Sequence, residues 1–150
     1  MDTIITKTWD IYIDENEVFS RCSNESLYQA YARTADNPKG DAIVMQEDDN
    51  GVFQVYFAAA LSNLRMLLAR RMEGMPVPSA SGITFTLNMH DNHDDNIQPI
   101  LINHCYDYLV KQILERWYGT NLGSELEKLE INHCLHYRKN PVRRRVRPMF

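Results

Sequence analysis

Histidine and cysteine occur side by side twice in this chain, in the tripeptide Asn-His-Cys at 103–105 and again at 132–134. Imidazole nitrogens and thiolates are common zinc ligands, and helical bundles often hold metals between inward His and acidic side chains. His104 and His133, with His136 nearby, would then serve a metal-dependent enzyme. However, the chain has neither HExxH nor a paired ExxH. Because a His on an apolar helix face is more often a hydrogen-bonded core residue, this enzyme stays the third hypothesis, and no metal or cofactor is predicted.

Other motifs do not indicate catalysis either. His90, Asp91, His93 and Asp94 precede a predicted helix, where such residues usually act as caps. Residues 48–51 resemble the start of a calcium loop, but the Glu that such a loop needs at its twelfth position is absent. The chain also lacks GxGxxG, a phosphate-binding loop and GxSxG. We therefore expect a protein that is not an enzyme.

The strongest signal is the uneven distribution of charge. Residues 138–150 contain six of the sixteen Lys and Arg residues and no acid. The first 137 residues have ten basic and twenty acidic side chains, a formal charge of −10. Pro141 and Pro148 disfavour helix, so an extended arm is predicted. The residues expected to bind a partner or a phosphate are Arg138, Lys139, Arg143, Arg144, Arg145 and Arg147.

Arginine dominates this arm, and its planar guanidinium pairs bidentately with carboxylate or phosphate. Two partners fit: the acidic body of a neighbouring copy, or the backbone of a nucleic acid. Head-to-tail contact between copies would form a ring if the contact closes. A conventional reader of a DNA groove is disfavoured, since no helix with a basic face is visible. A solvated arm with no partner is the remaining alternative.

Composition and length indicate one globular domain. The chain has 150 residues, of which 44% are hydrophobic and 24% charged, enough for a core of its own. We expect a helical domain over 1–137 and the arm over 138–150. Three cysteines without a CxxC motif predict reduced thiols rather than a disulfide framework. No apolar run close to the roughly 20 residues of a membrane span is visible, and a cytoplasmic location without membrane contact is expected.

Hydrophobic periodicity predicts a mainly α fold, a small bundle of three to four helices with one or two short strands. The predicted elements are a strand or extended lead-in over 4–13, helices over 15–34, 53–72, 97–118 and 121–137, and a half-buried strand over 83–89. The last helix aligns Leu122, Leu126, Leu129, His133 and Tyr137 on one face at near-heptad spacing. The side chains expected in the core are Phe57, Leu61, Leu64, Leu109, Ile113, Trp117, Leu126 and Leu129.

From about residue 14 to the end, the order of these elements resembles the small helical head-tail connector (adaptor) proteins of tailed phages and prophages. The most specific pieces are YLVKQILERWYGTN at 108–121 and the closing RKNPVRRR. The resemblance implies a virion structural protein that forms a ring at the portal. Its partners would be further copies, neighbouring portal and tail proteins, and DNA in the channel. The loop over 74–82 is short for this family, which leaves the connector type open.

A second hypothesis is that the chain is a small nucleic-acid-binding or regulatory protein, also without enzymatic activity. In this hypothesis the arm binds phosphate, and the copies do not form a ring. The two hypotheses differ in whether the arginines meet carboxylates of another copy or phosphates of a polymer.

Overall fold

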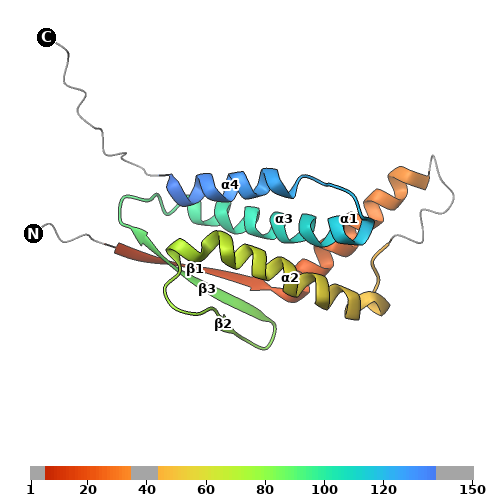
Figure 1. The fold of residues 1–150 in the computed structure, drawn as a ribbon, viewed down its shortest axis with the longest axis horizontal. Coiled ribbons are helices and arrows are strands. Elements are labelled where there is room, and N and C mark those ends of the chain that lie inside the picture. The colour runs from red at the N-terminus through yellow and green to blue at the C-terminus, as the bar shows by residue number, and fades with distance from the viewer. Residues whose placement is uncertain (1–5, 35–43, 138–150) are drawn as a thin grey trace, which may run out of the picture.

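A computed structural model describes residues 6–34 and 44–137, and for residues 29–34 it describes the backbone only. The elements, shown in Figure 1, are β1 (Thr6–Asp14), α1 (Glu15–Thr34), the 3-10 turn η2 (Glu47–Asp49), α2 (Asn50–Leu68), the 3-10 turn η3 (Ala69–Arg71), β2 (Val77–Pro78), β3 (Gly82–His90), α3 (Ile97–Tyr118) and α4 (Ser124–His136). The predicted extended arm, 138–150, lies outside the described residues.

The sheet joins segments that are far apart in the sequence. β1 pairs antiparallel with β3 along nine residues, from Thr6 opposite His90 to Asp14 opposite Gly82. β2 lies on the other side of β3, which gives the order β1-β3-β2. Alternate side chains of a strand point to opposite faces, and one face of this sheet is buried. The buried side chains are Trp9, Ile11, Ile13, Phe85, Leu87 and Met89. Both predicted strands are confirmed.

The helices cover this apolar face, with α3 at the centre (Figure 1). α1 and α3 contact the strands, while α2 and α4 pack against α3. A helix buried on several sides must be apolar around much of its circumference. The buried residues of α3 are Leu101, Cys105, Tyr106, Tyr108, Leu109, Val110, Ile113 and Leu114. The mainly helical class is confirmed, but the helices rest on an antiparallel sheet that is larger than expected.

The end of α3 fixes the start of α4. Gly119 closes α3 with a φ of 71°, as its position after the last apolar residue predicts. Glu115, one turn earlier, accepts hydrogen bonds from the backbone nitrogens of Leu122 and Ser124, both at 3.0 Å. Free N–H groups at a helix start are thereby satisfied. The direction of α4 is therefore set by a side chain of α3.

The predicted core is correct for α2 and α3. Phe57, Leu64, Leu109 and Ile113 are buried. Leu61 and Trp117 are partly buried and pack against the same cluster. All three cysteines are buried and free, as expected, and burial raises the pKa of the Cys22 thiol to about 12.

The predicted inward face of the last helix is wrong. Leu126 and Leu129 are 65% and 63% exposed, and α4 instead buries Ile131, Cys134 and Leu135. Two faces of this helix carry apolar residues, so periodicity alone cannot select between them. The Glu115 cap and the contact with α3 select the face that the sequence did not favour.

One helical segment, Glu47–Arg71, is long and apolar enough to cross a membrane by length and composition, contrary to the expectation from the sequence. The core helix of a globular domain meets the same criteria. Its buried side chains are Phe53, Phe57, Ala60, Leu64 and Leu68. In this fold the segment packs one face against α3, and 28% of its most apolar window is buried.

The two faces of α4 provide a test of the fold. We expect Ile131→Ala to lower the free energy of unfolding by about 2–5 kcal/mol, since it deletes a fully buried side chain. The matched change Leu129→Ala should stay within about 0.5 kcal/mol, because that side chain is largely exposed. Urea unfolding followed by circular dichroism measures both. A larger loss for Leu129→Ala than for Ile131→Ala would contradict the observed packing of α4.

Candidate functional site

The six predicted binding residues of the arm lie outside the described residues, but the place where the arm begins is defined. The described chain ends at Tyr137, directly after α4. His93, in the turn before α3, is buried, and its ring nitrogens lie 3.1 Å from the carbonyl oxygens of His90 and Leu135. This contact ties the end of α4 to the β3–α3 turn, in agreement with a structural role for the 90–94 cluster. The arm therefore starts from a firmly packed position.

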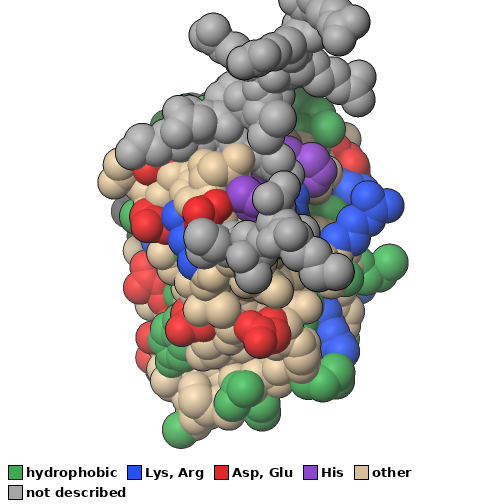
Figure 2. Space-filling view, turned by 90° about the vertical axis from the view of Figure 1, so that its left-hand side faces the viewer, with side chains coloured by type: hydrophobic (Ala, Val, Ile, Leu, Met, Phe, Trp, Pro, Cys, Tyr) green, Lys and Arg blue, Asp and Glu red, His purple; other side chains and the backbone are tan. Residues whose placement is uncertain are grey.

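The end of the molecule from which the arm leaves carries a basic groove of about 770 Å³. It lies between the end of α2, the strand β3 and the end of α4, and Arg70, Arg71 and His136 line it beside apolar side chains. Neither arginine forms an ion pair within residues 6–34 and 44–137. Figure 2 looks onto this end and shows most Lys and Arg side chains on the right, some on the left, and most Asp and Glu side chains on the left and in the centre.

An acidic groove of about 370 Å³ lies at the start of α1 and α2. Its lining residues are Glu15, Asn16, Phe19, Glu47, Asn50, Phe53 and Gln54. Among the described residues, neither Glu15 nor Glu47 has a cationic partner. One oxygen of Glu15, Oε1, is buried and has no hydrogen-bond partner there. A buried carboxylate oxygen without a hydrogen bond is unfavourable, and a hydrogen bond from a donor would stabilise it.

The two grooves lie at opposite ends of one straight segment. Glu47–Arg71 contains 25 residues, which corresponds to about 37 Å at 1.5 Å per residue. Figure 1 shows the start of α2 on the right and the ends of α2 and α4 on the left. Acids at the start and arginines at the end also suit the helix dipole. Glu15, which lines the same groove, lies in the first turn of α1 and suits the dipole of that helix in the same way.

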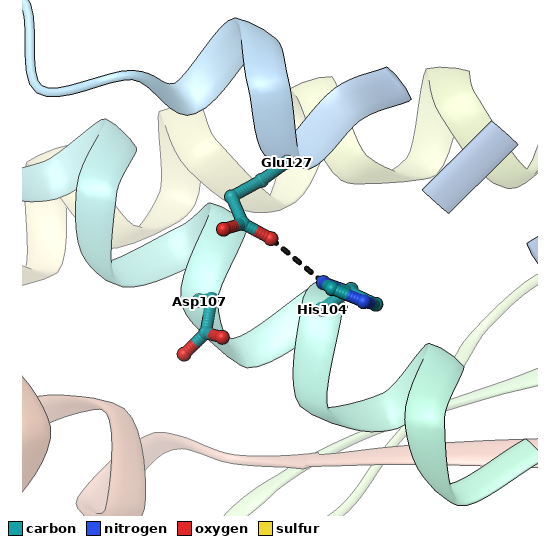
Figure 3. A group of neighbouring side chains, drawn as sticks. All are labelled: His104, Asp107 and Glu127. Carbon is teal, nitrogen blue, oxygen red and sulfur yellow. Dashed lines mark hydrogen bonds and ion pairs between the residues drawn. The ribbon is translucent and has the colours of Figure 1, made fainter. Parts of the chain in front are cut away.

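A cluster that the sequence did not predict joins α3 to α4 (Figure 3). His104 and Asp107 come from α3 and Glu127 from α4. Nδ1 of His104 donates to Oε2 of Glu127 at 2.8 Å, and Nζ of Lys111 donates to Oε1 of the same carboxylate at 2.8 Å. Glu127 is therefore held by two donors. It lies on the turn of α4 that faces α3, and no local pattern in the sequence pairs it with His104.

Ligand atoms of His104, Asp107 and Glu127 lie within 4.8 Å of one another, close enough to suggest a metal ion. The surrounding charges argue against it. Both oxygens of Glu127 already accept hydrogen bonds, one of them from the ammonium of Lys111. The guanidinium of Arg21 lies 3.8 Å from Asp107. Two neighbouring cations oppose the binding of a divalent metal ion by electrostatic repulsion. This arrangement is therefore best described as an ion-pair network.

The structure does not assemble the metal site considered from the sequence. His104 pairs with Glu127, whereas the ring of His133 lies 6.3 Å from the ring of Tyr137. Cys105 is fully buried, and burial raises the pKa of its thiol far above the ordinary value. A metal ligand must be a thiolate. These surroundings therefore disfavour Cys105 as a ligand.

Comparisons of the chain with models of protein families, with curated proteins and with solved structures found no match. The function must therefore be argued from the surfaces described above.

The ion-pair network should stabilise the fold in a pH-dependent way. Burial acts to raise the pKa of Glu127, but hydrogen bonds from Lys111 and His104 outweigh it and hold the pKa below the ordinary value. A lowered pKa in the folded state gives stability above the unfolded pKa, and this stability is lost as pH falls through the folded value. We expect Glu127→Gln to cost about 1–2 kcal/mol at pH 7. The cost should begin to shrink below the pKa of an unfolded glutamate, about 4.3, and should disappear below the lowered folded pKa.

The matched control for this variant is Glu130→Gln, an exposed acid on the same helix, which should change stability by less than about 0.5 kcal/mol. Urea unfolding at several pH values measures both variants. A Glu127→Gln cost that persists unchanged at pH 3 would contradict the assignment to the ionised carboxylate.

Metal binding can be tested directly. We expect elemental analysis of the purified protein to find no stoichiometric zinc, manganese or iron, because Lys111 and Arg21 already neutralise the carboxylates. Calorimetric titration with Zn²⁺ should likewise show no saturable site that disappears in His104→Ala. One equivalent of bound metal that is lost in His104→Ala would support the metal-dependent enzyme instead.

Proposed function

We propose that this chain is an assembly subunit without enzymatic activity, and that its Arg-rich arm docks onto an acidic surface of a neighbouring molecule. The observation that supports this most is the separation of charge. The arm, with six basic residues, starts beside Arg70, Arg71 and His136. The acidic groove lies about 37 Å away along α2.

This separation favours association between copies. A basic end and an acidic end on one molecule attract the opposite ends of other molecules, and such attraction raises the rate of encounter. The contact is heterologous, since two different surfaces meet, so it forms a ring if the rotation closes and a filament if it does not. Arginine suits this role because its guanidinium pairs bidentately with carboxylates.

In its finer form, the proposal is a head-tail connector (adaptor) of a tailed phage or prophage, with copies arranged in a ring at the portal. Support comes from the resemblance over 14–150 and from the placement of its most specific piece, 108–121. That piece forms the second half of the central helix α3 and its Gly119 cap. In this arrangement the arms would contact the next copy or neighbouring portal and tail proteins.

A separate observation supports a second candidate function. Arg70 and Arg71 are not paired within the described part of the chain, and together with the arm they would present a basic surface to a phosphate backbone. A small nucleic-acid-binding or regulatory protein would use both. The twenty acidic residues of the domain would repel a polymer over most of the remaining surface, so this candidate ranks second.

Removal of the arm tests the first proposal. We expect the full chain to associate at low ionic strength and to dissociate as salt rises, because exposed charges are screened beyond about 8 Å at physiological ionic strength. A chain truncated after Asn140 should remain monomeric in both conditions. Sedimentation velocity across a concentration series measures this. Equal association of the full and truncated chains, or a full chain that stays monomeric at low salt, would overturn the proposal.

Binding to DNA separates the two candidates. If five or six arm residues neutralise phosphates, the logarithm of the DNA binding constant should fall with that of salt concentration with a slope of about −4 to −5. Fluorescence anisotropy with a labelled duplex measures the slope. DNA binding with this slope by a protein that does not self-associate would favour the nucleic-acid-binding candidate.

A further inference from the structure

We propose that the acidic groove at the start of α1 and α2 is the acceptor for the arginine arm of a second copy. This inference rests on the proposed function and specifies which surface the arm binds. It commits to one occupant, residues Arg143–Arg147 of another chain.

The groove has the chemistry that an arginine needs. Glu15 from α1 and Glu47 from η2 contribute carboxylates from two separate elements. Phe19, which is partly buried, lines the same groove, and its ring packs edge to face against the buried ring of Phe53 at 5.0 Å. A guanidinium pairs with carboxylates and can place its flat face against an aromatic ring. The groove, of about 370 Å³, offers the two carboxylates and one aromatic ring, that of Phe19.

The acids of this groove differ from several others on the domain, because they have no cation beside them. Glu127 is held by Lys111, Asp107 lies near Arg21, and Asp95 pairs with Lys7 at 2.8 Å. In the described ranges, 6–34 and 44–137, Glu15 and Glu47 have no such neighbour. Their negative charge is therefore available to an incoming arginine.

Glu15 gives a second, independent observation. Its Oε1 is buried without a hydrogen-bond partner among the described residues, although the side chain as a whole is partly exposed. A buried acceptor without a donor is unfavourable. An arm arginine that enters the groove would meet the accessible part of this carboxylate, and a turn of the Glu15 side chain would bring Oε1 to the incoming N–H group.

The geometry favours the arm of another copy over the chain's own arm. Arg143 and Arg145 follow Tyr137 by six and eight residues, so even a fully extended arm carries them only about 21–28 Å. The acidic groove lies about 37 Å from Arg71 along the helical segment, and Arg71 lines the basic groove together with His136. The chain's own Arg143 to Arg145 therefore fall short of the groove, and only Arg147, ten residues after Tyr137, comes close to it at about 33–36 Å. The arginines of a neighbour in head-to-tail contact are not limited in this way.

A charge exchange between groove and arm tests the inference in the full-length protein. Glu15→Lys with Glu47→Lys, the groove variant, should weaken self-association by roughly ten-fold or more. Arg143→Glu with Arg144→Glu and Arg145→Glu, the arm variant, should do the same. An equimolar mixture of the two variants should regain association, because each altered arm then meets a groove of opposite charge. Sedimentation velocity on each variant and on the mixture measures this.

Two controls keep the result interpretable. Glu125→Lys with Glu130→Lys changes net charge by the same amount on the exposed side of α4 and should leave association within about two-fold of the original. Glu15→Gln with Glu47→Gln removes the charge with less risk to folding and should weaken association in the same direction. Circular dichroism confirms that each variant is folded.

The outcomes separate this inference from the proposed function. In one outcome, truncation after Asn140 abolishes association, but the Lys and Gln variants of the groove associate like the original chain. The arm then binds elsewhere, and only the groove assignment fails. If the Glu125 and Glu130 control weakens association as much as the groove variant, net charge rather than this groove is responsible. If truncation has no effect, the proposed function itself fails. Recovery of association in the mixture supports both.

Discussion

The straight helical segment Glu47–Arg71 is the constraint on which the rest depends. Its length holds the acidic groove and the start of the arm about 37 Å apart. Burial of Phe53, Phe57 and Leu64 fixes the segment against α3, so the two ends cannot approach each other without loss of the core. The rigid helix thereby keeps the basic groove and the acidic groove apart.

The local parts of the fold could be predicted from the sequence because each has a local cause. The strand over 83–89 has strict alternation, and the helix over 97–118 has a clear apolar pattern closed by Gly119. The pairing of β1 with β3 joins residues that are 68 to 84 positions apart, from Asp14 with Gly82 to Thr6 with His90, and no local pattern specifies it. α4 shows the limit of periodicity. Leu126 and Leu129 form a regular stripe, yet packing against α3 buries Ile131 and Leu135 instead.

The candidate surfaces divide in the same way. Composition alone predicts the arm, since basic residues are concentrated after 137, and this prediction lies outside the described residues. The acids at 47–49 suit a helix start, and nothing in the sequence places Glu15 of α1 beside them. Tertiary packing creates that groove. In the same way, His104 was considered with other His and Cys residues, while its partner in the fold is Glu127, from the following helix. Contacts between helices decide what these side chains do.

The central claim is that the arm of one copy lies in the acidic groove of another, and intermolecular paramagnetic relaxation tests it most directly. A spin label at Met149→Cys can be attached selectively, because Cys22, Cys105 and Cys134 are buried. Labelled chains are mixed with isotope-labelled chains without the spin label, so that only contacts between copies broaden signals. We expect broadening of amides in 15–19 and 47–54. Broadening at other surfaces only, or none in associated protein, would contradict the account.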